Sequence, residues 1–249
     1  PPLVAQLPGV RYAITSNGAA VWDLGTDPLA AVYSRYSDAA VRRTCEPVCL
    51  IRQVFPAEKA REVFGLYQEF EGSLSVFSDG MVIRDHLAQE RMGERQRRLL
   101  SLSTEAKQPN DGRFHIVRDT AEWRSRHAHE IEKFCMFFEN AEAAEAALPR
   151  FYALEGVEVV QGSPDNIEVT AKGVDKGSAL LALADRLGIP HECTLAVGDS
   201  DNDRAMLEKA GVAAVMANGM ERVKQLADIV SENDCDHDGV AEIFARLSV

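Results

Sequence analysis

The stretch Leu195-Ala-Val-Gly-Asp199-Ser-Asp201-Asn202-Asp203 decides the fold of this chain, because a short apolar run passes directly into a cluster of acids. The residues that follow, Arg-Ala-Met-Leu, are typical of a helix. In an open α/β sheet, ligands bind at such a junction, at the carboxyl end of a strand. Carboxylates held there suit a hard cation such as Mg²⁺, which keeps several waters and bridges to substrate phosphate. The stretch therefore predicts a metal-dependent site that handles phosphate.

Two simpler interpretations of the acidic cluster are weaker. Asp, Asn and Ser are common at helix N-termini, where they accept hydrogen bonds from free backbone N–H groups. Three acids and an Asn between residues 199 and 203 exceed what capping requires. A calcium loop would need Gly at its sixth position and Glu at its twelfth, where this chain has Arg204 and Ala210. We therefore reject the calcium loop.

Composition limits the possible partners. The chain has 249 residues, 46% hydrophobic content and a formal net charge of −12. An acidic chain without a basic stripe is not expected to bind nucleic acid, and no stretch is long and apolar enough to suggest a membrane span.

Five scattered cysteines are typical of reduced thiols, so we expect a cytoplasmic protein. The sequence predicts no oligomeric state, and because it opens with Pro1 instead of Met, we expect the natural chain to start upstream.

The order of predicted elements indicates an α/β fold with an insertion. From Lys176 onward, helices alternate with short apolar strands, which is typical of βαβ units in a parallel sheet. Residues 24–165 instead mix helical stretches at Ala57–Glu69 and Ala141–Leu154 with strand-like runs, as in an α+β module. We predict a Rossmann-like parallel-sheet core from residues 1–22 and 167–249. An inserted α+β domain, residues 23–166, interrupts that core, and Glu105–Gly112 within it is predicted to be an exposed loop.

Three motifs in this order carry a family resemblance: the early ITSNGA, the later VTAKGVDKGSALLALADRLGI, and GDSDND after its strand. Together they resemble the Cof-type phosphatases of the haloacid dehalogenase superfamily. The resemblance covers nearly the whole chain, and it includes NIEVTAKGVDKG as the return from an inserted α/β cap.

The resemblance implies Mg²⁺-dependent hydrolysis of small phosphorylated metabolites, such as sugar phosphates, through an aspartyl-phosphate intermediate. It assigns Asp199 as a magnesium ligand and Asp203 as a support of the metal, directly or through water. It assigns Asn202 to the phosphate, and Lys176 to neutralising the phosphate and positioning the nucleophile. Asn17 would line the cleft between core and cap. Such groups suit phosphoryl transfer, which depends on positioning and on stabilising charge on the phosphoryl oxygens.

Without the motifs, the same residues have ordinary explanations. A lysine that starts a helix, as Lys176 does, is usually solvated, and Asn17-Gly18 alone is a common turn. Glu168 faces either the cleft or a neighbouring strand, and its position in the sequence does not decide between them.

The attacking carboxylate of the family is not found ahead of ITSNGA. There the family has an apolar strand that ends in Asp-x-Asp-Gly-Thr. Asp236-His-Asp238-Gly239 matches these letters, but polar residues precede it, so we interpret it as a turn that caps the last helix. We expect the nucleophile to lie upstream of Pro1, because loss of a central strand would expose apolar faces, and we expect the chain without that segment to be inactive. A non-catalytic relative that binds phosphorylated ligands, or a phosphomutase of the same superfamily, are the alternatives.

Overall fold

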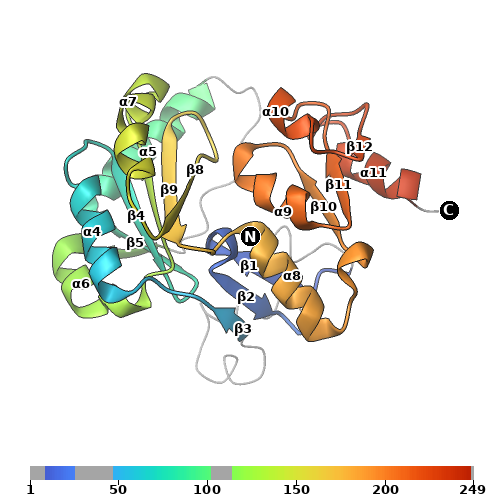
Figure 1. The fold of residues 1–249 in the computed structure, drawn as a ribbon. Coiled ribbons are helices and arrows are strands. Elements are labelled where there is room, and N and C mark those ends of the chain that lie inside the picture. The colour runs from blue at the N-terminus through green and yellow to red at the C-terminus, as the bar shows by residue number, and fades with distance from the viewer. Residues whose placement is uncertain (1–8, 26–46, 102–113, 248–249) are drawn as a thin grey trace.

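The structure, a computed structural model, describes residues 9–25, 47–101 and 114–247. The strands in these residues form three sheets (Figure 1). The largest lies on one side of the molecule, a parallel sheet on the other, and a small antiparallel sheet below them (Figure 1). None of the helices within the described ranges is long and apolar enough to cross a membrane.

The six-stranded sheet has the strand order β6-β5-β4-β7-β9-β8. It is a mixed sheet, because β5 and β6 pair in parallel while all other neighbouring strands pair antiparallel. Its strands are β4 (Ser73–Ser78), β5 (Met81–Asp85), β6 (Phe114–Val117), β7 (Lys133–Phe137), β8 (Val157–Val160) and β9 (Asn166–Ala171). The helices of this part are α4 (Ala57–Tyr67), α5 (His86–Ser101), α6 (Thr120–His127) and α7 (Ala141–Tyr152).

One face of this sheet packs its apolar side chains against α4 and α7. The ring of Tyr67 on α4 lies tilted against the rings of Phe134 and Phe151, and its hydroxyl donates to the carbonyl of Ile167. The side chains of β9 point alternately to the two faces of the sheet, as successive side chains in a strand do. Its apolar residues join this core, so Asn166, Glu168 and Thr170 lie on the other face, and they are buried there as well.

The other two sheets have three strands each. The antiparallel sheet contains β1 (Tyr12–Thr15), β2 (Ala20–Asp23) and β3 (Val48–Arg52). The parallel sheet contains β10 (Leu195–Gly198), β11 (Val212–Val215) and β12 (Ile229–Val230). The helices that accompany them are α8 (Lys176–Leu187), α9 (Arg204–Lys209), α10 (Glu221–Lys224) and α11 (Gly239–Leu247).

Helix α8 has the bounds that the sequence predicts, and its ends explain why. The Asp175 side chain accepts a hydrogen bond from the backbone N–H of Ser178 at 2.7 Å, which caps the helix N-terminus. Gly188 ends the helix in the left-handed conformation, at φ 68°. The cap fixes Lys176 as the first helical residue, and α8 packs against β1 and the turn that follows it.

Part of the predicted organisation differs from the structure. The parallel sheet from residue 195 onward is as expected, but β1 pairs antiparallel with β2 instead of joining β10. The helices α5 and α6 were not predicted, and the expected loop Glu105–Gly112 lies outside the described residues. The helix α5 is dominated by charged and polar residues, and α6 is short and weakly amphipathic, so the apolar signal from which a helix is recognised is sparse in both.

The predicted division into a core and a cap remains a prediction. Its boundary between residues 166 and 167 falls inside β9, whose residues 166–171 pair with β7 and β8. A strand cannot leave its sheet within this register, so the pairing favours a boundary after Ala171. Likewise β3, residues 48–52, pairs with β2 and not with the six-stranded sheet.

Candidate functional site

The acidic stretch that follows β10 folds back on itself around Asp203. The backbone N–H groups of Asp199 and Ser200 donate to Asp203 Oδ2 at 3.0 and 3.2 Å. Ser200 completes a capping box with Asp203 at the start of the short helical turn. Two donors that would otherwise be unpaired are satisfied in this way, so the loop is fixed by its own sequence.

Lys176 reaches this loop from the start of α8. Its Nζ donates to Asp203 Oδ1 at 2.6 Å and to Asn202 Oδ1 at 3.0 Å. Asp203 is buried, with 8% of its side chain exposed, while the Lys176 side chain is 27% exposed. Asn202 and Asp203 follow Lys176 by 26 and 27 positions in the sequence, and the fold brings them into contact with it.

Asp199 and Asp203 have pKa shifts in opposite directions. Burial alone would raise the pKa of Asp203, but the Lys176 charge and hydrogen bonds outweigh it and lower that pKa. Burial and the neighbouring Asp203 carboxylate raise the pKa of Asp199. Asp203 therefore carries a compensated charge, whereas Asp199 faces another carboxylate and would be stabilised by a cation.

Asp201, the remaining acid of the cluster, is not part of this arrangement. Its carboxylate pairs with the guanidinium of Arg222 on α10 through both oxygens. Asp201 lines a cavity together with Lys176 and Asn202, but both of its carboxylate oxygens are engaged by Arg222.

Asn17 lies beside Lys176 because the turn after β1 packs against the start of α8. Gly18 approaches Asp175 so closely that a Cβ there would lie 2.1 Å from the Asp175 carbonyl oxygen, and its φ is +101°. Only glycine meets both conditions. Asn17, Lys176 and Asn202 line one cavity of about 160 Å³, so the predicted phosphate-binding residues share one site.

A second cavity, of about 390 Å³, separates β1 from β10. Ile14 on β1, Leu180 on α8, Met206 on α9 and the β10 residues Leu195 and Val197 line it. In the described part of the chain, β1 and β10 are edge strands of their sheets. Among the described residues, β1 and β10 thus border one largely apolar trough, which Asn17 and Lys176 also line.

The six-stranded sheet contributes a residue that the sequence left undecided. Glu168 Oε2 accepts hydrogen bonds from Asn17 Nδ2 at 2.6 Å and from Lys133 Nζ at 3.0 Å, so Glu168 contacts both the turn after β1 and the neighbouring strand β7. Burial alone would raise the pKa of Glu168, but the Lys133 charge and these hydrogen bonds lower it. Lys133 had no signal in the sequence, whereas the alternation of polar residues in β9 indicated a polar face for Glu168.

The loop before β9 also reaches the site. A Cβ on Gly162 would lie 2.8 Å from Asn202 Nδ2. A larger residue at this position would require the loop or the side-chain amide of Asn202 to shift.

The residues present fit part of a magnesium site. No group of three or more His, Cys, Asp or Glu in the described ranges is arranged to hold a metal. Magnesium, however, is usually held by one or two carboxylates together with waters and substrate phosphate. Asp199 suits such a role. The oxygens of Asp203 already accept from Lys176 and two backbone N–H groups, which favours an indirect role for it.

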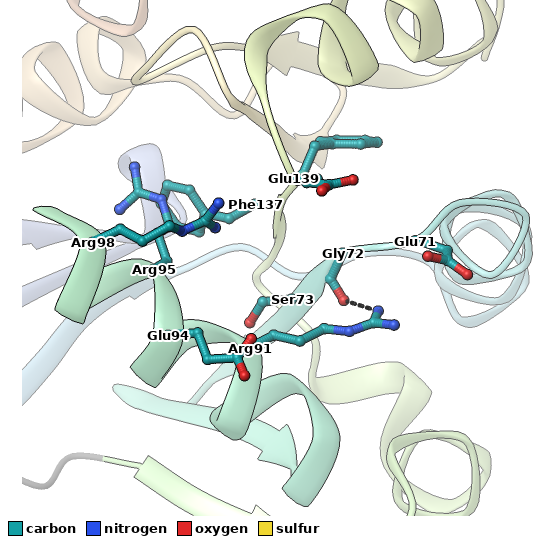
Figure 2. Close-up of a pocket in the computed structure, with 10 residues that line it drawn as sticks. Glu71, Gly72, Ser73, Arg91, Glu94, Arg95, Arg98, Phe137 and Glu139 are labelled. Atoms are coloured by element: carbon teal, nitrogen blue, oxygen red, sulfur yellow. Dashed lines mark hydrogen bonds between the residues drawn. The ribbon is translucent and has the colours of Figure 1, made fainter.

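A cavity of about 460 Å³ lies in the six-stranded part, between α5 and the ends of β4 and β7 (Figure 2). Arg95 in it pairs with Asp165 and lies over the ring of Phe137, and Arg91 donates to the carbonyl of Gly72. Three arginines and three glutamates line it. None of the residues predicted to bind phosphate or metal lines this cavity, so it is separate from the candidate site.

The Asp-x-Asp-Gly sequence at 236–239 lies in a turn, as predicted. Strand β12 ends at Val230, and the N–H of Gly239, where α11 begins, donates to the carbonyl of Asp234. Asp238 adopts a positive φ of 62°. No strand leads directly into Asp236, so its carboxylate is not held at a sheet edge.

The fold and site define an α/β protein with a lysine, an amide and paired carboxylates at the end of a parallel strand. The chain matches the model of the haloacid dehalogenase-like hydrolases over residues 39–244 and belongs to this family. Among solved structures, a haloacid dehalogenase-like hydrolase from B. subtilis matches 96% of this chain and 80% of its own, with a TM-score of 0.73 and 25% identity. The subclass IIB sugar phosphatase BT4131 shares the fold, with a TM-score of 0.66 and 19% identity over 96% of this chain and 76% of its own.

Curated relatives match shorter segments. The chain is 36% identical over 114 residues to the 5-amino-6-(5-phospho-D-ribitylamino)uracil phosphatase YcsE of Bacillus subtilis, which is 46% of this chain and 45% of that protein. It is 41% identical over 106 residues to the phosphatase YwpJ of Bacillus subtilis, 43% of this chain and 37% of that protein. The chain thus spans less than half the length of both relatives.

Proposed function

We propose that this chain is part of a magnesium-dependent phosphatase that hydrolyses small phosphorylated metabolites. The observation that carries the proposal is the contact of Lys176 with Asn202 and Asp203 at the end of β10, beside Asn17. The site combines a cation, two amides and a carboxylate pair, which are the groups needed to bind a phosphoryl group and balance its charge. Phosphatases among the relatives support the reaction class.

Each residue has a separate task in this proposal. Lys176 neutralises phosphoryl oxygens, and Asp203 holds its ammonium in place. The amides of Asn202 and Asn17 donate to the phosphoryl group and orient it. Asp199 supplies the carboxylate for Mg²⁺, which when bound neutralises phosphate charge as a Lewis acid.

The attacking carboxylate is proposed to come from a segment upstream of Pro1, so that hydrolysis passes through an aspartyl-phosphate. The trough between the open edges of β1 and β10 supports this idea, since an extended segment placed there would pair with both strands. A segment that runs parallel to β10, as β11 does, would end near Asp199, because β10 leads directly into the loop that carries it.

The test compares this chain with a version extended upstream, by phosphate release from a panel of sugar phosphates with and without Mg²⁺. Only the extended form is expected to turn over, and Asp199→Ala should abolish its activity. Asp201→Asn is the matched control in the same loop, because Asp201 pairs with Arg222, and it should lose far less. Unchanged turnover in Asp199→Ala would contradict the proposal. Phosphate binding without release by the extended form would favour a binding protein, and isomer formation would favour a phosphomutase.

A further inference from the structure

The turn that carries Asn17 has a strained backbone. Ser16, Asn17 and Gly18 have positive φ values of 52°, 56° and 101° in succession. A non-glycine residue in this region is disfavoured and persists only where its surroundings hold it. Something must therefore hold Ser16 and Asn17 in place.

Two carboxylates from the six-stranded part do so. Glu132, fully buried, accepts from Ser16 Oγ at 2.9 Å, and Glu168 accepts from Asn17 Nδ2 at 2.6 Å. The two donors are adjacent in the sequence and lie 116 and 151 residues from their acceptors. The turn is thus held by side chains of a different part of the molecule.

Each carboxylate is itself fixed by further contacts. Glu132 Oε1 accepts from Arg52 Nε and from the backbone N–H of Asp79, both at 2.9 Å. Glu168 accepts from Lys133 Nζ at 3.0 Å and from Asn166 Nδ2 at 3.1 Å. Acceptors held by several donors in a buried setting have little freedom to move, so they can define the position of the group they bind.

The contact with Glu168 also sets the orientation of the Asn17 amide. A carboxylate accepts only, so the NH₂ group of Asn17 must point at Glu168. One N–H of that amide and its carbonyl oxygen remain for the cavity that Asn17 shares with Lys176.

We propose that Glu168 is a positioning residue that holds Asn17 in place. Together with Glu132, it links the phosphate pocket to the six-stranded sheet: the pocket is ordered only while the sheet contacts the turn at residues 16–18. This inference rests on the proposed function, because it assigns Asn17 to the phosphate. When the sheet is seated on the turn, both donors are satisfied and the pocket is complete. When the sheet moves away, the strained turn loses both acceptors and the Asn17 amide is free to rotate.

A purely structural role of Glu168 is the competing explanation, since its pair with Lys133 also stabilises the sheet. The two differ in what happens when Asn17 is absent. A positioning residue acts through Asn17, so its replacement should have no further effect on turnover in an Asn17→Ala background. A structural residue would still lower turnover there.

The first arm of the test is hydrogen exchange of this 249-residue chain, followed by mass spectrometry. In Glu168→Ala, amides of the segment 12–23 should exchange about tenfold faster, which corresponds to a loss of ~1.4 kcal/mol of local stability, while β10 and β11 keep their protection. Asp85→Asn is the control: its partners, the Ala88 N–H and the Thr120 hydroxyl, both lie in the six-stranded part. Unchanged exchange of the 12–23 segment in Glu168→Ala would overturn the proposal.

The second arm measures kcat and KM of the upstream-extended form at a temperature where every variant is folded. Glu168→Ala should lower kcat at least about tenfold. Glu168→Gln should keep most of the parent kcat, because its amide oxygen still accepts from Asn17. Asp85→Asn should have the kcat of the parent. The double variant Asn17→Ala/Glu168→Ala should equal Asn17→Ala alone, and additive losses would overturn the proposal. If the parent releases no phosphate, the proposed function fails and the exchange arm alone decides this inference.

Discussion

Lys176 Nζ lies 2.6 Å from Asp203 Oδ1, and this contact joins the start of α8 to the loop after β10. The lysine is the only cation that the described structure places on Asp203, whose other oxygen accepts two backbone N–H groups. Replacement of Lys176 therefore tests both the architecture and the chemistry of the site.

Lys176→Met should destabilise the chain by about 2 kcal/mol, because it leaves the buried Asp203 carboxylate without its cation. The expected loss is smaller than for a fully buried ion pair, because Lys176 is partly exposed. Urea unfolding at pH 7 measures it. Lys172→Met is the control: Lys172 is 73% exposed and its pair with Glu158 spans 3.6 Å, so it should change stability by less than ~1 kcal/mol. Equal losses for the two variants would contradict the interpretation of the Lys176 contact.

The stability that Glu168 provides should depend on pH. Its pKa in the folded chain lies below the ordinary glutamate value of 4.5, so its contribution is complete above that value and is lost as pH falls through the folded pKa. At pH 7, Glu168→Gln should cost about 3 kcal/mol, because the buried Lys133 ammonium then has no opposite charge beside it. Unfolding titrations of both proteins from pH 7 to 3 should show this difference shrinking below pH 4.5, and a constant difference would refute the prediction.

Gly162→Ala should weaken substrate binding without unfolding the chain. The added Cβ would lie 2.8 Å from Asn202 Nδ2, so either the loop or the amide must shift. We expect KM of the extended form to rise about tenfold, a loss of ~1.4 kcal/mol. Gly65→Ala, in open space within α4, is the control, and it should leave KM unchanged while raising stability by up to ~1 kcal/mol.

Cys135 should resist alkylation while other thiols react. Burial, assisted by the nearby Glu168 charge, raises its pKa to about 12, so almost no thiolate exists at pH 8. Three other cysteines are exposed, Cys49, Cys193 and Cys235. Iodoacetamide should modify these three while Cys135 is still unmodified. Peptide mass spectrometry distinguishes them, and early modification of Cys135 in the folded chain would contradict the described burial.

The sequence by itself determined the local features of this protein. The bounds of α8 follow from Asp175 and Gly188, and β10 with its acidic loop follows from an apolar run that ends in capping residues, because caps and strand patterns depend on near neighbours. The same local logic identified Asp236 as a turn residue. The resemblance then selected Lys176, Asn17, Asn202, Asp199 and Asp203.

Only the tertiary structure decided how these pieces meet. It placed Lys176 on Asp203, paired β9 within the six-stranded sheet, and turned Glu168 toward Asn17, 151 residues away. It also distinguished Asp199, which faces another carboxylate, from Asp201, which pairs with Arg222. The physical reason is that a strand pattern tells which residues share a face, but the partner of that face and the charge next to each carboxylate depend on contacts between distant segments.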